Sequence, residues 1–275
     1  MAGSGHLQMA GPGDAGGGNC RSAGPMTNTI TTTSLRLSGR ENGPKGMSNG
    51  GFACGTFAGL VGGTAKVTLH QKVPLETDLR AQISDGRAQV RAGDRLLAVA
   101  EAVEPFVLEP PVRPTPAQAE AARERHPLRG LRHPLSDCVV CGPERRDGLG
   151  VTPGPLESDP DILAAPFRPT VGYAVDGLVR PAAVWGALDC PSYSAADLRT
   201  RRFCLLGSLE ACQVRPVEVT ESLVVVGWTR GVGRRSVQTA SAMIDEDGAV
   251  VASARAVWVA VRHQWAVKTI ARLVG

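Results

Sequence analysis

Residues 180–191 read RPAAVWGALDCP, and a long patterned segment, Glu210 to Val261, follows them. Pro181 stands where the first turn of a helix favours proline, and Pro191 should end that helix. The later segment alternates apolar and polar residues between turn signals, which predicts strands near 209–219, 222–230, 234–245 and 249–261. Together the two stretches predict one short helix followed by an antiparallel meander.

The first half of the chain repeats this order. Residues 49–63 predict a helix that turns Phe52 and Phe57 to one side, and residues 66–73, 87–92 and 95–104 predict strands. A further helix is expected over 116–125, with Thr115 and Gln118 at capping-box spacing. Its only apolar residues are alanines, so we expect it to lie in solvent.

A helix wrapped by an antiparallel meander, occurring twice, is the layout of an α+β double hotdog, an intrachain pseudo-dimer. The sequence also resembles actinobacterial proteins of the thioesterase-like hotdog superfamily over about residues 35–262. The resemblance lies in residues 41–44 (ENGP), 48–52 (SNGGF), 133–143 (HPLSDCVVCGP) and 185–191 (WGALDCP). It implies a hydrolase for acyl-CoA or a related acyl thioester that needs no cofactor, and the cysteine count and lack of a visible secretory signal or membrane span predict a cytoplasmic location.

The expected organisation has five segments. They are a disordered Gly-rich tail (1–30), a first hotdog half (31–110), a Pro- and Arg-rich connector with a short helix (111–146), a second half (147–262) and a C-terminal tail (263–275). The first tail carries no aromatic residue and many glycines, so it cannot bury enough apolar surface to offset the entropy of ordering, and we expect it to be dispensable.

Composition narrows the function class. The net charge is only +4, which does not favour nucleic-acid binding. No secretory signal or 18-residue apolar run is visible, and seven cysteines are unlike a disulfide framework. We therefore expect reduced thiols, no membrane span, and possible pairing of two pseudo-dimers into a homodimer.

Asn49, Gly50 and Gly51 begin the first predicted helix. Amides at a helix start carry partial positive charge and can hold a developing oxyanion. The resemblance assigns them that role, with Asn49 positioning the thioester and with Phe52, Gly55 and Trp185 as substrate contacts. The alternative is an ordinary Asn cap whose following glycines, Gly51 and Gly55 among them, pack the helix closely against its neighbours.

Asp189 lies late in the second predicted helix, at the negative end of the helix dipole, among apolar residues. Apolar surroundings raise the pKa of a carboxyl group, as suits a general base near neutrality. The resemblance makes Asp189 the base or nucleophile that faces the start of the other half's helix. A solvated Asp at a helix end is the alternative.

Cys138 and Cys141 have the spacing of half a zinc site. A structural site normally has four ligands, and His126, His133 and Cys190 are only conceivable extras. Two buried thiols in a turn are therefore the preferred interpretation, and we expect well below one zinc per chain. Cys190 is expected to be a core cysteine.

Two other functions remain open. The first is a non-catalytic hotdog module that binds acyl-CoA or a lipid, because neither helix begins with His-Gly-Gly. The second is a hotdog hydratase, which would need an Asp-His pair that the sequence does not place near either helix. Any of four arginine clusters could meet the phosphates of coenzyme A; these are Arg129/Arg132, Arg145/Arg146, Arg199/Arg201/Arg202 and Arg234/Arg235.

Overall fold

The computed structural model describes residues 30–264 except 132, 134 and 144, so nearly all of both predicted tails lies outside the described residues. In the first part of the chain the elements are β1 (Thr31–Leu35), α1 (Gly50–Ala58), β2 (Ala65–Leu69), β3 (Leu79–Ser84), β4 (Arg87–Ala92), β5 (Arg95–Ala102) and α2 (Pro116–Glu124). The later elements are β6 (Gly154–Pro155), β7 (Leu163–Phe167), β8 (Ala174–Val175), β9 (Leu178–Val179), α3 (Pro181–Asp189), α4 (Ala195–Arg199), β10 (Cys204–Gln213), β11 (Leu223–Val232), β12 (Ser236–Ile244) and β13 (Val250–Ala260). No helix among the described residues is long and apolar enough to cross a membrane.

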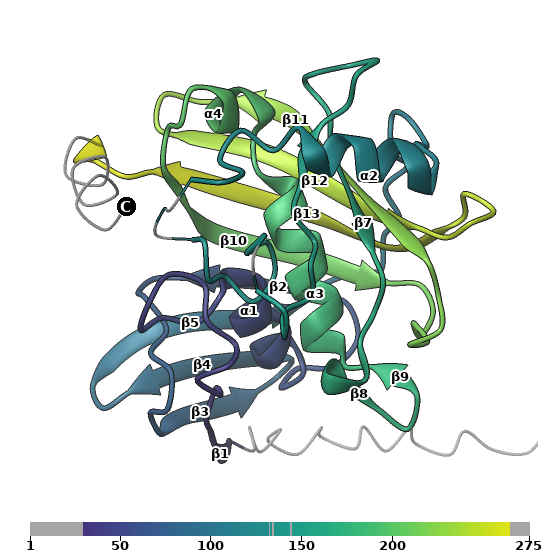
Figure 1. Ribbon diagram of the computed structural model, residues 1–275. Helices are drawn as coiled ribbons and strands as arrows, with labels where there is room; N and C mark the ends of the chain where they lie inside the picture. The colour runs from purple at the N-terminus through teal and green to yellow at the C-terminus, as the bar shows by residue number, and fades with distance from the viewer. Residues whose placement is uncertain (1–29, 132, 134, 144, 265–275) are drawn as a thin grey trace, which may run out of the picture.

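One antiparallel sheet runs through both halves in the order β1-β3-β4-β5-β2-β10-β13-β12-β11-β7-β6. The halves join where β2 pairs with β10, with Thr68 opposite Ser208 and Ala65 opposite Ala211. Figure 1 shows the first half in purple and blue below the second half in green and yellow, with α1 and α3 lying against the sheet. The predicted helix-and-meander layout, occurring twice, is therefore confirmed.

The helices α1 and α3 pack against each other in opposite directions. Gly51 near the start of α1 lies against Asp189 at the end of α3, and Gly55 lies against Ala182 at the start of α3. Phe52, Phe57 and Leu188 are fully buried in the core that the two helices share with the sheet. The C-terminal end of α3 thus meets the N-terminal end of α1.

Several predicted boundaries need correction. The first helix ends at Ala58, with Gly59 as its C-cap, so residues 60–63 lie beyond it. The strand predicted at 209–219 is β10, Cys204–Gln213, because Pro216 cannot continue a strand in the middle of a sheet. The strand β3 was not predicted, since its buried positions include a small alanine, Ala81, which gives a weak apolar signal.

The prediction that the helix over 116–125 lies in solvent is wrong. The capping box at Thr115 is present, but Ala119 and Ala122 are fully buried in a second core cluster against β7 and β11. Small side chains allow the close contact, since a Cβ on Gly154 would lie 1.7 Å from the carbonyl oxygen of Ala122. Alanine here marks close packing of a helix on a sheet.

Replacing Ala122 by Glu is expected to lower the free energy of unfolding by about 3 kcal/mol or more, because an unpaired carboxylate enters a closed apolar contact. The matched control is Ala121→Glu on the exposed side of the same helix. This substitution should change the free energy of unfolding by less than about 0.5 kcal/mol. Denaturant unfolding measures both variants. If both substitutions changed the free energy of unfolding equally, the prediction that this helix lies in solvent would be supported.

Candidate active site

The site centres on Asp189, which α3 carries into contact with the start of α1. Its Oδ2 accepts a hydrogen bond from the backbone amide of Gly51 at 3.0 Å and another from Asn49 Nδ2 at 3.0 Å. Asn49 is the N-cap of α1, and its Oδ1 accepts from the amide of Phe52 at 3.0 Å. The positive end of α1 therefore offsets the unfavourable dipole that Asp189 meets at the end of its own helix.

Burial dominates the electrostatics of Asp189. The side chain is 2% exposed, and this burial raises its pKa to about 7, although the Gly51 amide and Asn49 stabilise the charged form. Among the described residues, no group donates a hydrogen bond to Asp189 Oδ1. One oxygen is thus anchored, and the other keeps its lone pairs.

A cavity of about 1290 Å³ adjoins this carboxylate. Both halves and the connector contribute to its wall, and Asn49, Gly50 and Asp189 lie together on it. Apolar side chains supply much of the remaining wall, among them Met47, Leu69, Val73, Leu128, Leu135, Leu206 and Trp258. The cavity has the size of a site for a substantial ligand with an apolar part.

The predicted oxyanion role of the Gly51 amide needs correction, because that amide donates to Asp189 and Gly51 does not line the cavity. Asn49 lines the cavity, and both ends of its amide are bonded within the protein, so its contact with the thioester stays a prediction. Gly50 does line the cavity. Its amide has no hydrogen-bond partner among the described residues.

The three predicted substrate contacts are structural instead. Phe52 and Trp185 are 0% and 4% exposed, and neither lines the cavity. A Cβ on Gly55 would lie 2.6 Å from Ala182 Cα and 2.8 Å from Trp185 Cβ, so this glycine allows α1 and α3 to touch. The alternative that the glycines of α1 serve close packing holds for Gly51 and Gly55.

Three cysteines meet beside the carboxylate, so Cys190, which was only a conceivable extra ligand in the sequence, joins the pair Cys138 and Cys141. The sulfur atoms of Cys138, Cys141 and Cys190 all lie within 4.8 Å of one another. Hydrogen bonds from the other two thiols hold the pKa of Cys138 well below its usual range. Asn49 Nδ2 lies 3.7 Å from Cys138 Sγ and 3.8 Å from Cys190 Sγ, so one amide group links Asp189 to two of the three thiols.

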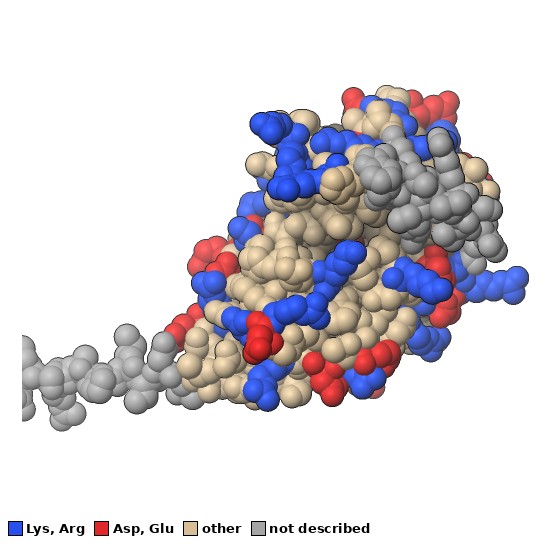
Figure 2. Space-filling view, turned by 90° about the vertical axis from the view of Figure 1, so that its left-hand side faces the viewer, with Lys and Arg blue, Asp and Glu red and all other residues tan. Residues whose placement is uncertain are grey.

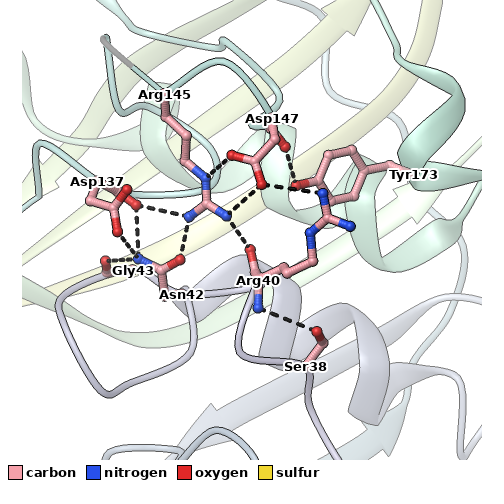
Figure 3. A network of polar contacts seen from close by, with 8 residues as sticks. All are labelled: Ser38, Arg40, Asn42, Gly43, Asp137, Arg145, Asp147 and Tyr173. Atoms are coloured by element: carbon pink, nitrogen blue, oxygen red, sulfur yellow. Dashed lines mark hydrogen bonds and ion pairs between the residues drawn. The ribbon is translucent and has the colours of Figure 1, made fainter.

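A polar network fixes the loops that carry these residues (Figure 3). Arg145, whose side chain is 8% exposed, donates to Asp137 O at 2.9 Å, to Arg40 O at 2.8 Å and to the side chain of Asn42. Its Nε is 2.9 Å from Asp147 Oδ1. Arg145 therefore clamps the connector to the loop before α1, and it is not available to bind a phosphate group.

Two of the four arginine clusters reach the cavity. The cavity is lined by Arg201, Arg202 and Arg235. It is also lined by Arg262, which belongs to none of the four clusters. Arg202 pairs with Asp197 at 3.3 Å, whereas no ion pair among the described residues involves Arg235 or Arg262. Figure 2 shows basic side chains along the upper edge of a largely uncharged, hollowed surface.

The comparisons with known proteins support the fold. No family model matches the chain, and no curated relative was found. Among solved structures, the tesB protein of Mycobacterium avium subspecies paratuberculosis is similar with a TM-score of 0.54 at 12% identity, covering 84% of this chain and 93% of that one. The dehydratase domain of PpsC from Mycobacterium tuberculosis, solved in complex with C12:1-CoA, is similar with a TM-score of 0.55 at 13% identity, covering 86% and 96%.

The chain therefore has a double-hotdog fold, as its sequence predicted. At these identities the likeness extends to architecture alone. Thioesterases and dehydratases both occur among the matched structures, so the reaction has to be argued from the site.

Proposed function

We propose that this protein hydrolyses acyl thioesters, with acyl-CoA as the substrate class. The observation that carries the proposal is the placement of Asp189 on the wall of a large cavity, with Oδ2 anchored by Gly51 and Asn49 and with no hydrogen-bond partner for the buried Oδ1 among the described residues. A carboxylate held in this way is positioned to act on a thioester carbonyl without losing orientation.

In the proposed reaction Asp189 Oδ1 takes a proton from a water molecule whose oxygen attacks the thioester carbonyl carbon. The carbonyl oxygen becomes negative, and the amide of Gly50 at the positive end of α1 stabilises it. The carbon–sulfur bond then breaks, and the leaving thiolate recovers the proton from Asp189. Direct attack by Asp189, forming an anhydride that water opens, is the nucleophilic variant of the same placement.

A thiol-release assay over a panel of short to long acyl-CoAs, with the purified full chain, tests this function. At least one member should release free thiol and carboxylic acid in equal amounts. Binding of acyl-CoA without release anywhere in the panel would favour a non-catalytic acyl-CoA-binding module.

Hydration of an unsaturated acyl thioester is the second candidate. The observation that favours it is that His70, His126 and His133 line the same cavity as Asp189, although the sequence places them far from both helices. An Asp and a His can share acid–base work on a double bond. Loss of the enoyl-CoA double bond without thiol release would identify this reaction.

The double variant Arg235→Gln, Arg262→Gln is expected to raise KM for acyl-CoA by about tenfold or more, because charge-assisted bonds to phosphate are lost. For the matching acyl-pantetheine, which lacks the nucleotide phosphates, KM should not change. Arg87→Gln, on β4 and paired with Glu101, is the control and should affect neither substrate. An equal rise for both substrates would count against a phosphate site at these arginines.

A further inference from the structure

Three thiols from two distant parts of the chain converge in this protein. Cys138 and Cys141 lie in the connector turn, Cys190 follows the last residue of α3, and the three sulfur atoms are within 4.8 Å of one another. A tetrahedral zinc site with Zn–S bonds of about 2.3 Å places its sulfur atoms roughly 3.8 Å apart. Sulfur atoms within 4.8 Å of one another are close enough to be three ligands of one small ion.

The connector turn, residues 138–142, packs closely around the sulfur atom of Cys138. The backbone amides of Val140 and Cys141 help to hold the pKa of Cys138 well below its usual range. Gly142 closes the turn so closely that a Cβ there would lie 2.6 Å from the carbonyl oxygens of Ser136 and Cys138. The sequence Cys-x-x-Cys-Gly is thus folded so that amides face a thiolate.

Asn49 adds a further donor, with Nδ2 3.7 Å from Cys138 Sγ and 3.8 Å from Cys190 Sγ. Donors that surround ligand atoms orient and stabilise them in metal sites. A disulfide within Cys138-x-x-Cys141 would use two sulfurs and leave Cys190 without a role. An ion uses all three.

We propose that Cys138, Cys141 and Cys190 bind one zinc ion, with its fourth coordination position facing the cavity that all three cysteines line. Thiolates prefer soft and borderline metals such as zinc. Three protein ligands with one open position are characteristic of zinc sites that meet a water or a ligand. This inference does not depend on the proposed hydrolysis.

The test begins with the unmodified full chain, purified under reducing conditions without chelator, exposed to zinc and desalted. Elemental analysis should find close to one zinc per chain, and X-ray absorption should find about three sulfur atoms at about 2.3 Å from it. Removal of the zinc by a chelator should lower the melting temperature by about 5 °C or more.

The variants Cys138→Ser, Cys141→Ser and Cys190→Ser should each reduce the bound zinc to less than about a tenth of the wild-type amount. Cys212→Ser is the matched control, because Cys212 is also buried but lies in β10 with Thr64 as its partner. It should keep its zinc.

Failure of the reduced wild-type chain to take up zinc would overturn the proposal whether or not the variants fold. Zinc without sulfur ligands, or zinc retained by all three serine variants, would overturn it too. Loss of zinc from Cys212→Ser together with the three variants, at unchanged melting temperatures, would show that the metal is not held at this cluster.

Discussion

Asp189→Asn is expected to lower kcat for acyl-thioester hydrolysis by at least about a hundredfold, the lower range for loss of a general base. The amide keeps the size of the carboxylate. Its oxygen can still accept from Gly51 and Asn49, and its NH2 group then occupies the unpartnered position of Oδ1. The packing contacts should survive while the group that takes the proton is lost.

Steady-state kinetics with the best acyl-CoA of the panel measure this loss, and calorimetric binding should show that affinity for acyl-CoA is kept. Asp245→Asn is the control, since Asp245 is paired with Arg215 and does not line the cavity. More than half of the wild-type rate in Asp189→Asn would make the carboxylate structural. A loss well beyond ten-thousandfold would favour the nucleophilic variant.

The architecture could be predicted because its signals are local. Period-two alternation identified most strands of the second meander, and Pro181 and Pro191 bracketed α3 to within a residue. The strand β3 lacked such a signal, because small residues such as Ala81 are compatible with a strand, a helix or a loop. The prediction was also wrong for α2. Ala119 and Ala122 are buried, although this helix was expected to lie in solvent because its only apolar residues are alanines.

The site could be predicted only in part. Asp189 stood out because a carboxylate at the end of a helix among apolar residues is unusual, and the structure brings it to Asn49 and Gly51 as the resemblance implied. Which residue at the start of α1 lines the cavity could not be predicted. The hydrogen bond from Gly51 to Asp189 decides it, and that bond depends on the antiparallel packing of α1 and α3.

The cysteine cluster could likewise be predicted only in part from the sequence. The sequence displayed Cys138 and Cys141 as a pair and offered Cys190 only as a conceivable extra ligand alongside two histidines, so two buried thiols were the preferred interpretation. The turn at the end of α3 and the connector meet only in the folded chain. A ligand set made of one local pair and one distant residue carries no complete spacing signal.

Gly51→Ala is expected to destabilise the fold by about 3 kcal/mol or more, at the upper end of the cost of overpacking a core. A Cβ on Gly51 would lie 2.5 Å from Asp189 Cβ, 2.6 Å from the carbonyl oxygen of Trp185 and 2.8 Å from Gly186 Cα. Two of these atoms belong to the backbone of α3, so the helices must separate. Alanine raises helix propensity by about 1 kcal/mol over glycine, which is too little to offset that separation.

The matched control is the same substitution at the C-cap of the same helix. Gly59 has a helical φ of −58°, and the nearest atom to a Cβ there would be Thr56 O at 3.4 Å, which belongs to its own turn. Gly59→Ala should therefore leave stability unchanged or raise it by up to about 1 kcal/mol. Denaturant unfolding should show a large loss of stability for Gly51→Ala and none for Gly59→Ala. If Gly51→Ala were as stable as Gly59→Ala, the start of α1 would not be packed on α3, and Asp189 would lose the Gly51 amide on which the proposed chemistry depends.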